Sequence, residues 1–172
     1  GKRALVTGSS SGIGIGIAQA LAAEGVAVVV HGRNVDRAQQ VATAIADSGG
    51  TAAVATGDLT TDEGAQLVAD AARAAFDGID ILVNNAGGAL ALADKSWFAV
   101  PMSEWLTSYE RNVMAAGRLI HHLVPAMRER AWGRVVQIST AAATLPTSAQ
   151  PDYGPAKAAL LNMSLGLSKS LT

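Results

Sequence analysis

The chain has 172 residues, of which 49% are hydrophobic and 16% charged, and its net charge is −1 at pH 7. This composition is typical of a well-buried globular domain, and it excludes a disordered chain and a basic protein built to bind nucleic acid or an anionic membrane. Cysteine is absent, so disulfides and thiolate nucleophiles are excluded as well. No apolar run approaches the ~18 residues of a membrane span, and the first apolar segment begins too early to leave room for a signal peptide. We therefore expect a cytoplasmic protein.

Apolar strand patterns alternate with helical patterns along the whole chain. We expect strands over residues 4–7, 26–30, 51–56, 79–83 and 135–139. We expect helices over residues 14–24, 34–47, 62–76 and 103–130, and from residue 152 to the end, with a longer loop over residues 87–101. The strands are apolar throughout, as in a parallel sheet covered on both faces. The sequence therefore predicts one α/β domain over residues 1–172, with a doubly wound, Rossmann-type sheet in three α/β/α layers.

A glycine-rich loop, TGSSSGIGIG, joins the first predicted strand to the first predicted helix. A pyrophosphate must approach backbone amides closely, and the helix N-terminus adds partial positive charge, so glycines at Gly8, Gly12 and Gly14 predict a phosphate cradle. The spacing lacks the Gly-Lys-Ser/Thr ending of a P-loop, which disfavours nucleotide triphosphate hydrolysis. A plain strand-to-helix turn is the alternative. We interpret Gly16 as a helix-packing residue.

Three further features occur in order downstream of this loop. Asn-Asn-Ala-Gly occupies residues 84–87, Asn112 lies within the long helix, and Tyr153 precedes Lys157 by four residues. Together with T-G-x3-G-I-G at residues 7–14, they resemble the short-chain dehydrogenase/reductase family, and most closely its classical branch, which includes the 3-oxoacyl-[acyl-carrier-protein] reductases. The resemblance implies an NAD(P)-dependent oxidoreductase acting on a small carbonyl or alcohol, and a homo-oligomer, tetramer or dimer, formed through the two long helices.

The resemblance also assigns roles to residues. Tyr153 would be the acid/base, and Lys157, one helical turn away on the same face, would favour the phenolate and lower the Tyr pKa from its usual ~10. Asn112 would support a proton-relaying water by widening its helix. The family serine lies thirteen residues before the tyrosine, which gives Thr140 here. Ser139 would serve instead if the following loop holds one extra residue.

Cofactor choice in this family depends on the end of the second strand. An acidic residue there would bond the ribose 2′-hydroxyl of NAD, but Gly32 occupies the position and Arg33 follows. A guanidinium pairs well with a 2′-phosphate, which favours NADP(H) and leaves NAD(H) as the alternative. The basic residue that often precedes the second motif glycine is replaced by Ser11. The predicted cofactor-binding residues are Gly8, Ser10, Ser11, Gly12, Ile13, Gly14, Arg33, Asn34, Asp58, Leu59, Asn84, Ala86, Gly87, Tyr153 and Lys157.

Other expectations remain open. The family continues beyond Thr172 with two more strands and a helical lid, so we expect the C-terminal part of the fold to be missing from this sequence. Trp97 and Phe98 either contact an apolar substrate or pack against the body of the protein. His121 and His122 point about 100° apart on a helix, and we expect no metal site. A catalytically silent NADP(H)-binding sensor or scaffold is the alternative function.

Overall fold

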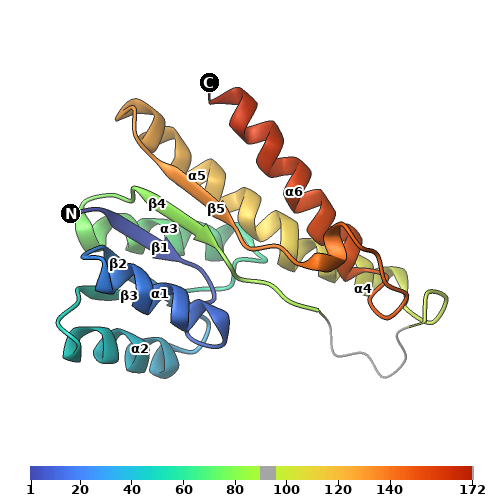
Figure 1. The fold of residues 1–172 in the computed structure, drawn as a ribbon, viewed down its shortest axis with the longest axis horizontal. Helices are drawn as coiled ribbons and strands as arrows, with labels where there is room; N and C mark the ends of the chain where they lie inside the picture. The colour runs from blue at the N-terminus through green and yellow to red at the C-terminus, as the bar shows by residue number, and fades with distance from the viewer. Residues whose placement is uncertain (90–95, 172) are drawn as a thin grey trace.

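The structure is a computed structural model that describes residues 1–89 and 96–171; residues 90–95, within the predicted loop 87–101, and residue 172 lie outside the described part. Five parallel strands form one sheet in the order β3-β2-β1-β4-β5 (Figure 1). The strands are β1 (Arg3–Val6), β2 (Ala27–Gly32), β3 (Ala52–Thr56), β4 (Ile81–Asn84) and β5 (Arg134–Gln137). The strand order reverses between β1 and β4, which makes their carboxyl ends the topological switch point where such sheets bind ligands.

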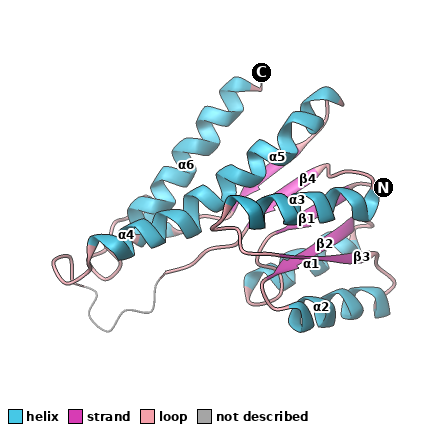
Figure 2. Ribbon diagram, turned by 180° about the vertical axis from the view of Figure 1, so that it is seen from behind, coloured by secondary structure: helices cyan, strands magenta, loops and turns pink. Residues whose placement is uncertain are grey.

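The described residues form the helices α1 (Ile13–Ala23), α2 (Val35–Asp47), α3 (Asp62–Phe76), α4 (Met102–Tyr109), α5 (Ala115–Glu129) and α6 (Tyr153–Ser170) (Figure 2). α4 packs against α6 beyond the carboxyl edge of the sheet, and the other helices cover the sheet. The predicted α/β layers and strand–helix alternation are confirmed, with element ends shifted by one or two residues. Asn34 caps the N-terminus of α2, because its Oδ1 accepts a hydrogen bond from Arg37 N at 2.9 Å. Within the described residues, none of the helices combines the length and the hydrophobicity needed to cross a bilayer.

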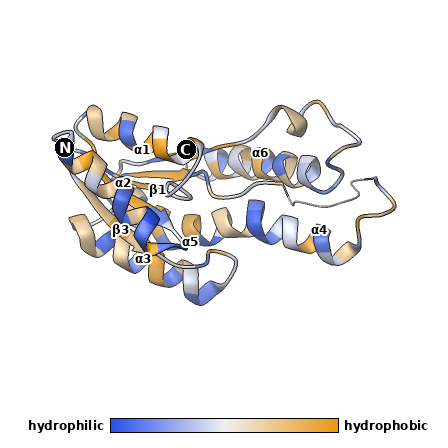
Figure 3. Cartoon of the chain, turned by 90° about the horizontal axis from the view of Figure 1, so that it is seen from below, coloured by the Kyte–Doolittle hydropathy of each residue, from blue (hydrophilic) through white to orange (hydrophobic). Residues whose placement is uncertain are grey.

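The core lies in two halves, one on each face of the sheet. Val28 and Val30 of β2 point toward α1 and α2, whereas Val29 points toward α3 and α5. Figure 3 shows hydrophobic strands in the middle layer, between helices that carry both hydrophobic and hydrophilic residues. This alternation follows from the pleat of a strand, since successive side chains point to opposite faces. Packing on both faces supports the sheet below the carboxyl ends of its strands.

The long helix predicted over residues 103–130 is interrupted by a π-helical turn, Glu110–Met114. Asn112 lies inside this turn and is only 1% exposed. Its Nδ2 donates to Ser108 O at 2.9 Å, the carbonyl that a regular α-helix would bond to the backbone N–H of residue 112. The side chain therefore replaces a backbone bond, and the widening expected at Asn112 is confirmed.

His31, at the carboxyl end of β2, connects the ends of three strands. It is 3% exposed. Its Nδ1 accepts a hydrogen bond from Gly8 N at 3.0 Å, and its Nε2 donates to Gly57 O at 3.2 Å. Only the neutral ring with its proton on Nε2 makes both bonds. Burial lowers the pKa of His31 from its ordinary value of 6.5, which favours that neutral form.

Gly14 and Gly16 stand two residues apart in α1 but have opposite surroundings. A Cβ on Gly14 would lie 2.5 Å from Gly8 O and 2.6 Å from Asn85 Nδ2. Gly16 is exposed, and a Cβ there would meet no atom within 4 Å. The interpretation of Gly16 as a packing residue is therefore wrong, and the close approach belongs to Gly14.

We expect Gly16→Ala to raise the free energy of unfolding by about 1 kcal/mol, because alanine costs less backbone entropy than glycine in an exposed helix interior. The matched variant Gly14→Ala should lower it by about 1–3 kcal/mol through overpacking against backbone atoms. Urea denaturation of the full-length protein measures both changes. A destabilising Gly16→Ala would show that residue 16 is packed against something.

A second prediction concerns the pH dependence of stability. Because the folded-state pKa of His31 is depressed, the unfolded chain binds the proton first as the pH falls. The stability contributed by neutral His31 is present above pH 6.5 and is lost as the pH falls toward the folded-state pKa. His31→Phe should remove this component, and at pH 7.5 it should cost about 1–3 kcal/mol because Gly8 N and Gly57 O lose their partner.

Denaturation curves between about pH 5 and 8 compare wild type, His31→Phe and the control His121→Phe, which removes an exposed histidine. The control should keep the wild-type pH profile. If His31→Phe keeps it too, His31 does not titrate as described.

Candidate active site

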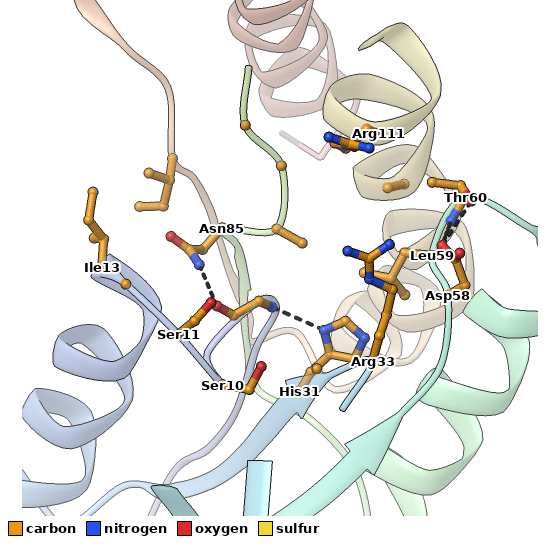
Figure 4. Close-up of a pocket in the computed structure, with 18 of the residues that line it drawn as sticks. Ser10, Ser11, Ile13, His31, Arg33, Asp58, Leu59, Thr60, Asn85 and Arg111 are labelled. Carbon is orange, nitrogen blue, oxygen red and sulfur yellow. Dashed lines mark hydrogen bonds between the residues drawn. The ribbon is translucent and has the colours of Figure 1, made fainter. Parts of the chain in front are cut away.

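A cleft of about 640 Å³ opens at the carboxyl edge of the sheet, over the switch point between β1 and β4 (Figure 4). Most of the predicted site residues line it: Gly8, Ser10, Ser11, Gly12, Ile13, Arg33, Asn34, Asp58, Leu59, Ala86, Gly87, Ser139, Tyr153 and Lys157. Gly14, Asn84, Asn112 and Thr140 do not line it. The fold thus gathers side chains from both halves of the sequence into one concave site.

The glycine loop forms one wall of the cleft. Gly12 has φ +57°, serves as the N-cap of α1, and would meet no atom within 4 Å if it carried a Cβ. Gly8 has φ +63°, and a Cβ there would lie 2.9 Å from Ala86 Cα. Gly12 therefore leaves the N-terminus of α1 accessible from the cleft, while Gly8 lets the β4 loop approach. The open backbone at a helix N-terminus fits a phosphate group.

Thr7 and Asn85 bind the glycine loop to the β4 loop. Thr7 Oγ1 accepts hydrogen bonds from Asn85 N at 2.9 Å and Ala86 N at 2.8 Å, and it donates to Val83 O at 3.2 Å. Asn85 Nδ2 donates to Thr7 O at 2.8 Å and to Gly8 O at 3.3 Å. These bonds fix the two loops on either side of the switch point.

Asn84 was predicted to bind the cofactor, but Asn85 lines the cleft instead. Asn84 is the last residue of β4 and is 3% exposed, and its side-chain amide has no hydrogen-bond partner among the described residues. The alternation of a strand directs Asn84 into the interior. The next residue lies beyond the strand and is free to face the glycine loop, so the prediction for Asn84 is corrected by one position.

Tyr153 and Lys157 lie one turn apart at the start of α6, on the cleft side. Lys157 is 3% exposed, its Nζ donates to Ile138 O at 2.9 Å, and it lies 5.9 Å from the centre of the Tyr153 ring. Burial raises the pKa of Tyr153 and lowers that of Lys157. The expected lowering of the Tyr153 pKa is therefore not found, because burial of the phenol raises it.

Asn112 contacts the loop after β4, near Lys157. Its Oδ1 accepts from Gly88 N at 2.9 Å, and its Nδ2 donates to Gly88 O at 3.1 Å. A Cβ on Gly87 would lie 2.5 Å from Asn112 Oδ1 and 3.4 Å from Lys157 Nζ. Asn112 therefore does not line the cleft, but it holds Gly88 of the loop that lines it. Because Gly87 has no side chain, space remains between the Asn112 amide and Lys157 Nζ.

Ser139 and Thr140 differ in what their hydroxyl groups do. Ser139 lines the cleft, yet its Oγ donates to Lys157 O at 3.4 Å. Thr140 lies just outside the cleft lining, as the residue before the short 3₁₀ turn Ala141–Ala143, and its hydroxyl makes no hydrogen bond within the described residues. The Ser139 hydroxyl is thus occupied by the backbone of α6, whereas the Thr140 hydroxyl is free.

The opposite end of the cleft carries the residues predicted to choose the cofactor. A Cβ on Gly32 would lie 2.1 Å from Ser10 Oγ, so no larger residue fits there without moving Ser10. Arg33 is exposed at the rim. Asp58 Oδ1 accepts from Thr60 N at 3.0 Å and from Thr60 Oγ1 at 2.8 Å, and these bonds hold the pKa of Asp58 low. Position 32 therefore carries no acidic residue of the kind that would bond the ribose 2′-hydroxyl of NAD.

Sequence reasoning missed several lining residues, among them His31, Asn85 and Arg111. His31 had a signal, because it precedes Gly32 at a strand end; Arg111 had only its position beside Asn112. Neither Trp97 nor Phe98 lines the cleft: Trp97 packs edge-on against Trp105 with ring centres 5.2 Å apart, and Phe98 is 97% exposed. Over residues 1–89 and 96–171, no group of three or more His, Asp or Glu side chains is placed to hold a metal ion.

Known proteins share both this sequence and this fold. Uncharacterized oxidoreductase YvaG of Bacillus subtilis strain 168 is 36% identical over 174 residues, which cover 100% of this chain and 63% of YvaG. The L-sorbose reductase of Gluconobacter frateurii, crystallised with NADPH and L-sorbose, has a TM-score of 0.93 and 37% identity, over 99% of this chain and 64% of the reductase. A 7α-hydroxysteroid dehydrogenase complexed with NADH and 7-oxo glycochenodeoxycholic acid has a TM-score of 0.92 and 33% identity, over 99% of this chain and 66% of the dehydrogenase.

The chain thus spans slightly less than two thirds of the length of YvaG and of the sorbose reductase. Similar proteins also include 3-oxoacyl-[acyl-carrier-protein] reductases of Aquifex aeolicus and Escherichia coli, at 33% and 32% identity. Since the names range from sugar and steroid enzymes to acyl-carrier reductases, they do not single out the 3-oxoacyl branch. Residues 2–172 match the family described as short chain dehydrogenase. The ordered motifs, the cleft they build and this match along almost the whole sequence agree, and the chain belongs to the short-chain dehydrogenase family.

Proposed function

We propose that the protein is an NADP(H)-dependent oxidoreductase that interconverts a carbonyl compound and the corresponding alcohol. The observation that carries the proposal is the layout of the cleft. Lys157 is bonded to Ile138 just after β5, Arg33 follows β2, and the glycine loop follows β1, which lies between β2 and β4. Solved relatives containing NADPH or NADH support a nicotinamide cofactor. The substrate is a small carbonyl or alcohol, and relatives acting on a ketose or on an oxosteroid define the classes to test first.

The nicotinamide cofactor, when bound, supplies or accepts the hydride. The α1 N-terminus at Gly12 and Ile13 would hold its phosphates, and Arg33 would pair with the 2′-phosphate of NADP(H). Tyr153 Oη would donate its proton to the substrate carbonyl oxygen as the carbonyl is reduced. Burial raises the pKa of Tyr153, so the phenol keeps its proton at neutral pH.

Thr140 is the proposed hydrogen-bond donor to the substrate carbonyl. Its hydroxyl is free, while that of Ser139 is bonded to Lys157 O. Lys157 and Asn112 act behind Tyr153: the buried ammonium lies beside the ring, and the Asn112 amide holds Gly88 in place. A silent NADP(H)-binding protein with the same cleft is the alternative, and it would bind the cofactor without turnover.

The catalytic proposal predicts that Tyr153→Phe lowers turnover by about 10²–10⁴-fold, because the phenol proton is lost while the ring is kept. NADPH oxidation is followed with the full-length protein over a panel of ketoses, oxosteroids and 3-oxoacyl thioesters. The Kd for NADPH should stay within about twofold, since the ring still fills its place. Turnover retained in Tyr153→Phe would contradict this mechanism, and tight NADPH binding by the wild type with no turnover would favour the silent alternative.

Thr140→Val and Ser139→Ala are the matched pair that separates the two hydroxyl groups. Thr140→Val should lower kcat/KM by about 10²-fold, as the loss of one donor to a developing oxyanion does. Ser139→Ala should change it by less than about threefold. The opposite result would assign the carbonyl contact to Ser139.

The cofactor proposal predicts that Arg33→Leu raises the Kd for NADPH by about 10–100-fold, which corresponds to a lost charge-assisted hydrogen-bond pair. The Kd for NADH should change by less than about twofold, because NADH has no 2′-phosphate. Calorimetric titration of the full-length protein measures both constants. An equal loss of both affinities would remove Arg33 from the role of selecting the cofactor.

A further inference from the structure

Arg111 is a half-buried arginine in the cleft wall, and none of the acidic residues in the described part of the chain forms a direct ion pair with it. It lies in the π-helical turn Glu110–Met114 and lines the same cleft as the glycine loop. Within residues 1–89 and 96–171 its guanidinium makes no hydrogen bond and no ion pair. A guanidinium that is partly removed from water and makes no direct ion pair is suited to bind a ligand anion in the cleft.

The acidic residues nearest to Arg111 are already engaged. Glu110, its neighbour in sequence, accepts from Arg118 Nη1 at 2.8 Å, and Arg118 also pairs with Asp62. Asp58 accepts from Thr60 with Oδ1 and makes no direct ion pair with Arg33 or Arg111 within the described residues, although the charges of both arginines help to lower its pKa. The fold thus pairs Arg118, one to two turns further along the same helical run, and leaves Arg111 open to the cleft.

The cleft as a whole is positively charged, although the chain carries a net charge of −1. Four basic side chains line it (Arg33, Arg37, Arg111 and Lys157), against one carboxylate, Asp58. A lining of this kind attracts a ligand with several negative charges. A dinucleotide cofactor fits, since it carries a pyrophosphate, and NADP(H) carries a further 2′-phosphate.

The position of Arg111 along the cleft indicates which phosphate it faces. Its neighbour Asn112 is bonded to Gly88, beside the Tyr153–Lys157 end, whereas Arg33 follows β2 at the other end. Figure 4 shows Arg111 on the helix across the cleft from the glycine loop, with Arg33 rising toward it from the end of β2. Arg111 therefore lies between the two ends, where the middle of a dinucleotide would pass.

We propose that Arg111 binds the pyrophosphate of the nicotinamide cofactor from the wall opposite the glycine loop. The backbone amides at the α1 N-terminus then hold one side of the pyrophosphate, and the Arg111 guanidinium holds the other. Arg33 selects the 2′-phosphate, while Arg111 binds the part that NADP(H) and NAD(H) share. This inference rests on the proposed function, because it requires that a nicotinamide cofactor occupies the cleft.

The test is calorimetric titration of the full-length protein with NADPH and, separately, with NADH. Arg111→Leu should raise both Kd values by about tenfold, because one charge-assisted contact to a shared group is lost. Arg33→Leu should raise the Kd for NADPH alone. Arg128→Leu removes an exposed arginine outside the cleft lining and should change neither constant, which controls for net charge.

Arg111→Lys keeps the charge but not the planar fork, so it should raise both Kd values by about threefold. It also serves if Arg111→Leu fails to fold, which thermal melting of each variant would reveal. Unchanged constants in a folded Arg111 variant, or a loss confined to NADPH, would overturn the pyrophosphate assignment while leaving the proposed function intact. A wild type that binds neither NADPH nor NADH would overturn both.

Discussion

The hydrogen bonds of Thr7 join the two loops that every other part of the cleft depends on. Its side-chain oxygen accepts from Asn85 N and Ala86 N, and Asn85 Nδ2 bonds back to Thr7 O. The carboxyl ends of β1 and β4 are therefore locked together where the strand order reverses. His31, at the end of β2, adds hydrogen bonds to Gly8 after β1 and to Gly57 after β3, so the end of β3 is connected to the same loops. Glycines are required here because the locked loops approach each other too closely for side chains, as at Gly8 and Gly14.

Away from the cleft the fold pairs its partly buried arginines with carboxylates, and at the cleft it leaves polar groups open. Asp80 accepts from Arg3 through both carboxylate oxygens, and Arg118 is paired twice. In contrast, the Arg111 guanidinium and the N-terminus of α1 have no side-chain partner within the described residues. Such groups lower stability unless a ligand compensates them. Their convergence on one concave surface is the physical basis for placing the cofactor there.

The regular elements could be predicted because their signals are local. Apolar runs and helical patterns each act within a few residues, and the ends of the elements in the structure differ from the predicted ends by one or two positions. The errors occur where two nearby residues of the same type are predicted from a motif, because the motif does not show which of them faces the cleft or a packed neighbour. Asn84 and Asn85 are the same residue type, and only the end of β4 decides which of them faces inward. Gly14 and Gly16 are alike in sequence, and only the packing of α1 against Gly8 separates them.

The sequence by itself determined the order of strands and helices, the glycine loop, and the four-residue spacing that places Tyr153 and Lys157 on one helix face. These depend on backbone preference and periodicity, which short stretches of chain carry. Only the tertiary structure decided that the Ser139 hydroxyl bonds the backbone of α6 and that His31 supports the glycine loop. It also decided that Arg118 pairs with Asp62 and Glu110, while Arg111 forms no direct ion pair with any residue that the structure describes. Each of these outcomes depends on which groups, distant in the sequence, lie next to a side chain in the folded protein, because hydrogen bonds and ion pairs act over a few ångströms of space and not along the sequence.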